Sequence, residues 1–286
     1  MGIFRERMIK DLQLAGYAPG TQGHYVRCAR NLVAFHMRPP TALSSEDVRE
    51  FFVDLHDRGA SLGVLKMHVA GIKWFYVRTL NRPEVVQGLR YPRVTSVLPE
   101  ILSGTEVQAL LGALEVQKYR MLVTTMYATG LRVGEACRLE TRDIDAARML
   151  VHVRAGKGRK DRVTMLSPGL LEQLREYWSS TRPRMPYLFP SKSPLYRTVS
   201  PKTVRAALHQ AAEQAGLRKN VTPHILRHCF GSHMLHMGAE LRQIQILLGH
   251  ESIETTARYT QMTPQYIAAM RSPFDVLGTK EAERLG

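Results

Sequence analysis

The chain has 286 residues, 44% of them hydrophobic, which is enough for one large domain or two ordinary ones around a core. Lys and Arg number 40 against 25 acidic residues, and the net charge of +15 favours a polyanionic partner such as nucleic acid over a merely solvated basic surface. No segment approaches the roughly 20 continuous apolar residues of a membrane span. The three cysteines also lack the spacing of zinc ligands. We therefore expect a cytoplasmic protein that neither spans a membrane nor binds zinc through cysteines.

Residues 1–90 have the apolar periodicity of helices throughout, which predicts a small helical domain. The segment 44–47 (Ser-Ser-Glu-Asp) is typical of a helix start, with acidic residues in its first turn. The segment 62–80 carries Lys66 and Lys73 among apolar residues and predicts an amphipathic helix. Its basic side chains either form a solvated face or lie against a DNA backbone, since long side chains can extend past an apolar stripe.

Prolines at positions 83, 92 and 99 interrupt the helical pattern. Proline lacks a backbone donor and disfavours helix in the residue before it. We therefore predict a linker at residues 91–98, between the helical domain and a larger domain at residues 99–286.

Helical periodicity resumes beyond this linker. Thr105 is predicted to cap one helix, and a second helix at 119–128 is predicted to end at Gly130. A third helix should follow at once and carry Arg132 and Glu135, which are three residues apart and so share a face.

The period then changes from helical to extended. Residues 149–154 and 162–166 each predict a short strand, and the glycine-rich segment 155–160 predicts the turn that joins them. Such a hairpin can present Lys157 into a groove as a proton donor. The fold class expected is therefore mainly α with a small antiparallel β-sheet.

A Thr-Pro pair at 222–223 predicts a helix start directly before His224 and Arg227. These two residues share a helical face close to backbone N–H groups, an arrangement that suits a phosphate. A metal site is the alternative, because His228 lies four residues after His224. The Glu that a helical zinc motif needs after its first His is absent, so we expect no metal.

Five short segments form an ordered set along the chain: residues 128–135, 156–158, 222–228, 247–250 and 255–259. They resemble, in this order, the motifs of the tyrosine recombinases, the family of phage integrases and Xer-type recombinases. Through Thr21, Tyr25 and Phe35, the N-terminal region also resembles that family's SAM-like, core-binding DNA-binding domain. The resemblance implies a two-domain clamp around double-stranded DNA.

The resemblance also implies the chemistry. Tyr259 should attack a DNA phosphate and form a 3′-phosphotyrosine, because a phenolate both attacks and leaves readily. Arg132 and Arg227 should clamp the non-bridging oxygens, with a further hydrogen bond from His250. Tyr266 is a rival nucleophile, but it lacks the Thr-Thr that precedes the first tyrosine.

Proton transfer is implied for two further residues. His224 should serve as general base toward the tyrosine, and Lys157 should protonate the leaving 5′-oxygen. Arg159 and Lys160 are rivals for the role of Lys157 and candidates for DNA contact, as are the lysines of the segment 62–80. Glu135 should orient the arginines, or else form only a surface pair.

No metal or cofactor is required by this chemistry, because the protein–DNA bond conserves the energy of the phosphodiester. The partners implied are DNA containing a specific recombination site and a homotetramer on two duplexes, with or without a second recombinase or an accessory factor. The tail at 263–286 docks either on a neighbouring protomer or on its own domain. Two alternative functions remain, a type IB topoisomerase and a DNA-binding regulator that keeps the fold without strand transfer.

Overall fold

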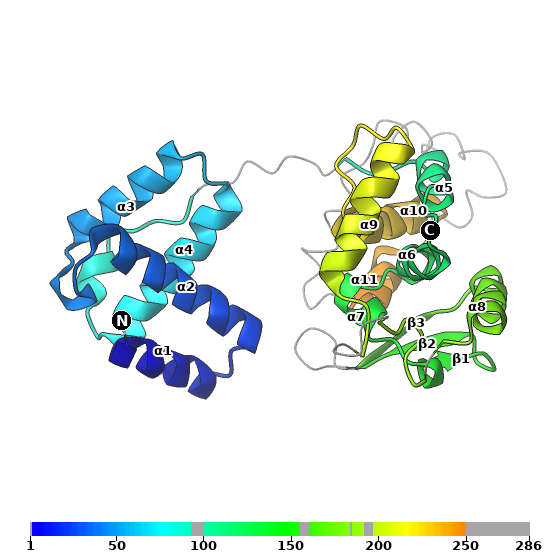
Figure 1. The fold of residues 1–286 in the computed structure, drawn as a ribbon, viewed down its shortest axis with the longest axis horizontal. Coiled ribbons are helices and arrows are strands. Elements are labelled where there is room, and N and C mark those ends of the chain that lie inside the picture. The colour runs from blue at the N-terminus through cyan, green and yellow to red at the C-terminus, as the bar shows by residue number, and fades with distance from the viewer. Residues whose placement is uncertain (1, 93–99, 155–160, 184, 192–196, 250–286) are drawn as a thin grey trace, which may run out of the picture. The chain divides into compact units, whose positions relative to one another are not determined.

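The computed structural model describes residues 2–92, 100–154, 161–183, 185–191 and 197–249. The chain divides into two compact units, residues 1–97 and residues 98–286, which are described separately (Figure 1). The predicted linker at 91–98 lies mostly outside the described residues and stays a prediction. Within the described residues no helix is long and apolar enough to cross a membrane.

The N-terminal unit is a bundle of helices in which α2 and α4 pack closely along one another. Gly71 permits this approach, because a Cβ atom there would lie 2.9 Å from the Cβ of Cys28 and 3.1 Å from the Cα of Tyr25. A capping box between Ser44 and Asp47 begins the third helix. The helices are α1 (Gly2–Leu14), α2 (Pro19–His36), α3 (Ser45–Asp57) and α4 (Leu62–Trp74). Two short 3-10 helices, η1 (Pro40–Ala42) and η3 (Pro83–Val86), and the π-helix η2 (Phe75–Thr79), which continues α4, complete the unit.

The C-terminal unit combines helices with a three-stranded antiparallel sheet in the order β1-β2-β3. Val151 pairs with Thr164 in the register of the last two strands, as expected for a hairpin. The elements are α5 (Gly104–Gly112), α6 (Gln117–Thr129), α7 (Val133–Cys137), η4 (Thr141–Asp143), β1 (Ile144–Asp145), β2 (Leu150–Val153), β3 (Arg162–Met165), α8 (Pro168–Thr181), α9 (Pro201–Gln214), α10 (Pro223–His236) and α11 (Leu241–Leu248).

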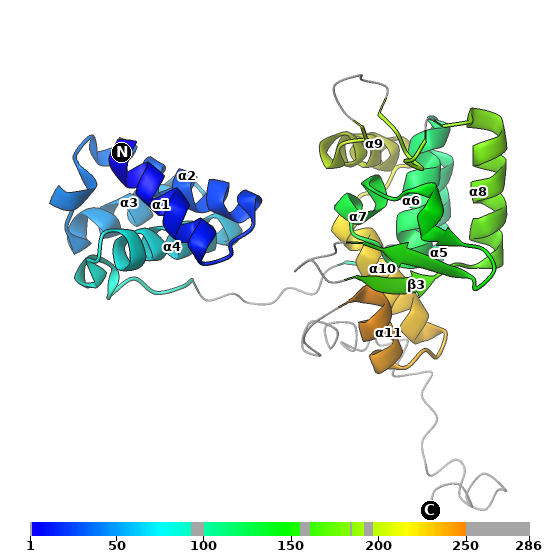
Figure 2. The same cartoon turned by 90° about the horizontal axis from the view of Figure 1, so that it is seen from below.

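Helix α6 is the centre of this unit, in contact with α5, α7, α8, α9 and α10 (Figure 2). Its side chains Leu122, Val123 and Met126 are fully buried in the main apolar cluster. The end of α6 is therefore held firmly, and the chain leaves it at Gly130 toward α7.

The predicted fold class, mainly helical with a small antiparallel sheet, is confirmed. The predicted cap of α5 was wrong, and one strand was missed. Ser103, rather than Thr105, caps α5, because its hydroxyl accepts from the backbone N–H of Glu106 and the Glu106 carboxylate bonds back. The first strand was not anticipated, because its two residues, 144–145, are too short for a periodic signal.

Candidate functional site

Arg227 is buried at the junction of three segments. It lies on α10, whose first turn is fixed by the Thr222 hydroxyl accepting from the backbone N–H of Ile225 at 3.2 Å. The side chain of Arg227 is almost fully buried, with 2% exposed. Its Nη1 donates to the carbonyl of Gly130 at 2.6 Å, and its Nη2 donates to the carbonyl of Leu248. The guanidinium is therefore held between the end of α6 and the end of α11.

Two glycines let the backbone approach this junction. Gly130 ends α6 with φ of +65°, and a Cβ atom there would lie 2.5 Å from Cδ1 of Phe230. Gly249 ends α11 with φ of +63°, and its Cβ would lie 2.6 Å from Cδ of Arg162. A left-handed backbone and a close neighbour both favour glycine at these positions. The predicted helix end at Gly130 is confirmed.

Arg132 is the N-cap of α7 and has an extended backbone, with ψ of 149°. The prediction that the helix itself would carry Arg132 was therefore wrong, because the helix begins one residue later, at Val133. The backbone N–H of Arg132 donates to Oε2 of Glu135 at 2.8 Å, and its Nη1 donates to Oε1 of the same carboxylate at 2.9 Å. Its side chain is 30% exposed. The carboxylate thus orients Arg132, while part of the guanidinium stays accessible to a ligand.

Glu135 is buried and shared between two arginines. Arg162, the first residue of β3, donates from Nη1 to Oε1 at 2.9 Å and from Nη2 to Oε2 at 2.8 Å. Burial raises the pKa of Glu135, but the hydrogen bonds from Arg162 and Arg132 outweigh it and lower the pKa to about 2. The carboxylate is therefore ionised at neutral pH.

The histidines of α10 differ in their exposure and contacts. His224 is exposed in the first turns of α10, with its ring 4.5 Å from that of His228 at 78°. His233 is tied into the fold, because its Nδ1 lies 2.7 Å from the Tyr127 hydroxyl and its Nε2 lies 3.0 Å from the Leu102 carbonyl oxygen. Burial lowers the pKa of His233, because it disfavours the charged form of the ring. These two hydrogen bonds give His233 a structural role.

Several predicted site residues lie outside the described residues. The segment with the candidate proton donor lies in the sequence between β2 and β3, and the fourth of the five resembling segments, 247–250, ends directly after Gly249. Their predicted roles stay predictions. The residues concerned are Lys157, Arg159, Lys160, His250 and Tyr259.

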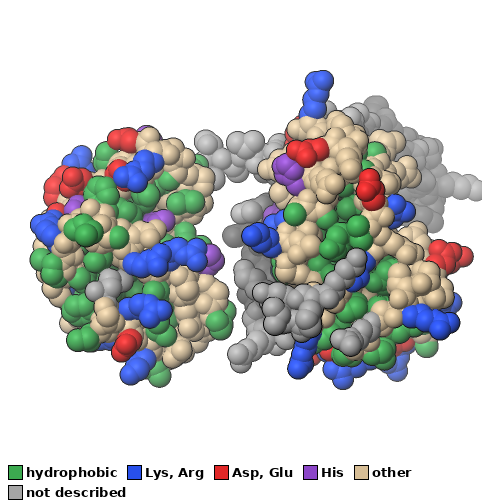
Figure 3. All heavy atoms as spheres, in the orientation of Figure 1, with side chains coloured by type: hydrophobic (Ala, Val, Ile, Leu, Met, Phe, Trp, Pro, Cys, Tyr) green, Lys and Arg blue, Asp and Glu red, His purple; other side chains and the backbone are tan. Residues whose placement is uncertain are grey.

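Basic side chains recur on the N-terminal unit, and Figure 3 shows Lys and Arg groups on its visible face. Lys66 is exposed on α4. Lys73 is half-buried, and its Nζ lies 5.4 Å from the ring centroid of Tyr91, a cation–π contact. Lys66 is accordingly the more accessible of the two for a phosphate.

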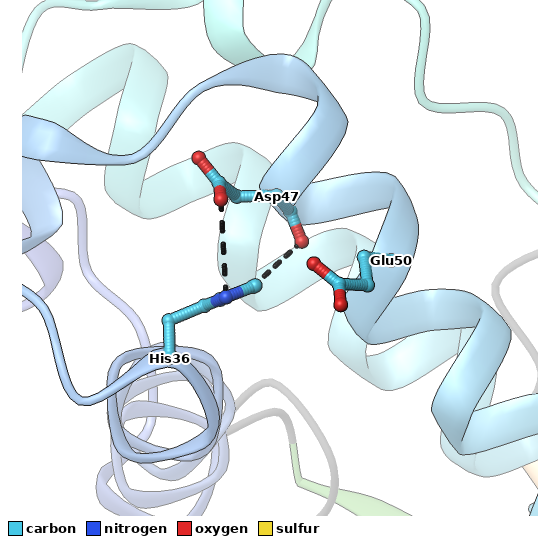
Figure 4. A group of neighbouring side chains, drawn as sticks. All are labelled: His36, Asp47 and Glu50. Atoms are coloured by element: carbon cyan, nitrogen blue, oxygen red, sulfur yellow. Dashed lines mark hydrogen bonds and ion pairs between the residues drawn. The ribbon is translucent and has the colours of Figure 1, made fainter.

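One group of side chains among the described residues has the spacing of metal ligands, and it lies in the N-terminal unit (Figure 4). It consists of His36, Asp47 and Glu50. The Asp47 carboxylate already accepts from the backbone N–H and hydroxyl of Ser44, both at 2.7 Å, and from Arg38. His36 Nε2 lies 2.8 Å from the Asp47 carbonyl oxygen. The Asp47 carboxylate is thus occupied as part of the capping box of α3, and His36 is held by the backbone of the same helix.

Arg162 is the site residue that the sequence analysis missed. Its position was anticipated as part of a strand, but strand periodicity does not show which side chain reaches a carboxylate 27 positions away. The only signal in the sequence was an acidic residue, Glu135, three positions after Arg132. It predicted the Arg132–Glu135 contact but not the second arginine, Arg162.

The comparisons with known proteins cover nearly the whole chain. Residues 100–265 match the phage integrase family, and residues 4–84 match the phage integrase N-terminal SAM-like domain. The integrase/recombinase y4qK of Sinorhizobium fredii is 39% identical over 97% of this chain and 90% of its own. The tyrosine recombinase XerA of Pyrococcus furiosus is 37% identical over 80% of this chain and 79% of its own.

Solved structures share the fold at lower identity. A crystal structure of XerA recombinase has a TM-score of 0.55 and 24% identity, over 95% of this chain and 99% of that one. A lambda integrase (75–356) dimer bound to a COC′ core site has a TM-score of 0.76 and 17% identity, over 95% of this chain and 98% of that one.

Proposed function

The chain belongs to the phage integrase family and is a tyrosine recombinase of the Xer and integrase type, and we propose that its nucleophile is Tyr259. In this proposal the phenolic oxygen attacks a phosphorus of duplex DNA and forms a 3′-phosphotyrosine. The bond from phosphorus to the 5′-oxygen breaks, which leaves a free 5′-hydroxyl. A 5′-hydroxyl from the partner strand then attacks the phosphotyrosine, releases the phenolate and rejoins the strand.

The observation that carries the proposal is the fixed pair of guanidinium groups. Arg227 donates to the carbonyl of Gly130, two residues before Arg132, while Glu135 orients Arg132 from α7. In phosphoryl transfer, negative charge accumulates on the non-bridging oxygens, and fixed guanidinium groups stabilise it without reorganising. We propose that Arg132 and Arg227 bind these oxygens, with a further hydrogen bond from His250.

Two proton transfers complete the reaction. Tyrosine has a pKa of about 10 in water, so the attacking phenol must lose its proton to a base. His224 is our candidate, since its side chain is exposed near the start of α10. Lys157 on the hairpin turn is the candidate donor to the leaving 5′-oxygen, with Arg159 and Lys160 as its rivals.

We propose that the helical domain at residues 1–90 and the domain at 99–286 grip DNA from two sides. The exposed Lys66, together with Lys73 and the basic hairpin turn, would contact phosphates. Relatives with known complexes include the lambda integrase fragment bound to its core site, which supports duplex DNA as the partner. Exchange of four strands requires four active sites, so we propose a homotetramer in the cytoplasm on two recombination sites.

The proposal is tested by trapping the covalent intermediate. The protein would be mixed, in the presence of a chelator, with nicked duplexes carrying candidate sites and then run on a denaturing gel. We expect a slow-migrating adduct with the wild-type protein and with Tyr266→Phe, and none with Tyr259→Phe. An adduct that persists in Tyr259→Phe and disappears in Tyr266→Phe would contradict the assignment.

The same substrates separate the alternative functions. Tight, salt-sensitive binding with no adduct on any site would favour a DNA-binding regulator. Relaxation of supercoiled DNA that lacks a recombination site, without exchange between duplexes, would favour a topoisomerase. Exchange of strands between two site-bearing duplexes is the result that the proposal predicts.

A further inference from the structure

Arg162 connects three segments of the C-terminal unit through one side chain. Its Nη1 and Nη2 donate to both oxygens of Glu135 on α7, and its Nε donates to the carbonyl of Leu247 on α11 at 3.3 Å. The side chain itself is only 12% exposed. Two parallel hydrogen bonds from one guanidinium to one carboxylate form the most directional ion pair available to proteins.

The path of this side chain is also fixed by packing. A Cβ atom on Gly249 would lie 2.6 Å from Cδ and 2.9 Å from Nε of Arg162. The glycine therefore makes room for the arginine as it passes the end of α11. Strand β3 is in contact with α11 along this line.

The charges of the cluster set its electrostatic effect. Glu135 is buried, with 6% of its surface exposed, and its single negative charge faces both Arg132 and Arg162. Two guanidinium groups and one carboxylate leave a net charge of +1. If Arg162 were neutral, the Arg132–Glu135 pair would have no net charge and would attract a phosphate far less.

We propose that Arg162 is a positioning residue for strand cleavage: it neutralises Glu135, so that the charge of Arg132 is available to the scissile phosphate. It acts through Arg132 and does not touch DNA itself. The inference rests on the proposed function of Arg132 as a phosphate ligand. It adds a role for β3, which is also in contact with α11, the helix whose end belongs to the segment 247–250.

The test measures the single-turnover rate of adduct formation at saturating protein, together with the apparent Kd for DNA. Arg162→Gln should slow cleavage about tenfold or more, as does the loss of a group that stabilises transition-state charge. The apparent Kd for DNA should stay within about twofold of the wild-type value. Arg162→Lys keeps the charge and should retain most of the rate. The double variant Arg162→Gln/Glu135→Gln has the wild-type net charge of the cluster and should be faster than Arg162→Gln alone.

Arg148→Gln is the matched control, because Arg148 is an exposed arginine that pairs with Asp145 of the same sheet. The Arg148→Gln variant should cleave DNA at the wild-type rate. Thermal unfolding of each variant identifies those that fail to fold. Wild-type cleavage rates in Arg162→Gln would overturn the inference. So would equal losses in the Lys, Gln and double variants, which indicate a purely structural role. An inactive wild-type protein would instead contradict the proposed function on which the inference rests.

Discussion

The Glu135 ion pairs predict a specific dependence of stability on pH. The pKa of this carboxyl falls from its usual value of 4.5 to about 2 in the folded protein. A lowered pKa means that the stabilisation is present above the unfolded value and is lost as the pH falls from about 4.5 toward about 2. This lowering of the pKa corresponds to about 3 kcal/mol of stabilisation, of which about 2 kcal/mol is lost by pH 3.

The perturbation is Glu135→Gln, which removes the charge and leaves both arginines without their carboxylate. Unfolding by urea would be followed through Trp178, which packs against the core of the C-terminal unit, in a Trp74→Phe background. The chain has only two tryptophans, so this background makes the signal specific for that unit. We expect Glu135→Gln to cost about 3 kcal/mol or more at pH 7, since the largely buried Arg162 and the partly exposed Arg132 both lose their charged partner.

The decisive quantity is the difference in unfolding free energy between the wild-type protein and Glu135→Gln. It should shrink by about 2 kcal/mol between pH 6 and pH 3. The exposed Glu176→Gln is the control, and its difference from wild type should stay within about 0.5 kcal/mol at every pH. A Glu135→Gln difference that is the same at pH 6 and pH 3 would refute the reasoning.

Two further predictions concern the glycine at the end of α6 and the basic surface. Gly130→Ala should destabilise the C-terminal unit by about 2 kcal/mol or more in urea unfolding, because it combines a positive φ with a contact at 2.5 Å from Phe230. Gly238→Ala, which has a positive φ but open space, should cost less, and equal costs would contradict the packing argument. DNA binding should weaken steeply with salt, and Lys66→Ala should reduce the slope of log K against log[salt] by about 1; an unchanged slope would remove Lys66 from the phosphate contacts.

Helix boundaries near the site could be predicted because they depend on local chemistry. Thr222 and Pro223 begin α10 as expected, since a hydroxyl cap and a proline at the first position act within one turn. Gly130 ends α6 in the left-handed conformation that its lack of a Cβ permits. The hairpin of β2 and β3 followed from the change in period.

Contacts between distant segments could not be predicted. Arg227 is fixed by carbonyl oxygens of Gly130 and Leu248, and a backbone carbonyl leaves no trace in the identity of its residue. Arg162, on the strand β3 that packs beside α11, reaches Glu135 on α7, an arrangement set by the tertiary fold. The role assigned to Glu135 was therefore derived without the arginine that binds both of its oxygens.

The most direct test of the central claim is the identity of the tyrosine that bonds to DNA. Trypsin cuts after Arg258 and Arg271, so Tyr259 and Tyr266 fall in one peptide, residues 259–271. The adduct would be trapped on a nicked site, digested with nuclease and trypsin, and fragmented in a mass spectrometer. Our account predicts a nucleotide phosphate on the N-terminal residue of that peptide, Tyr259. A phosphate on Tyr266, or on any other peptide, would contradict it.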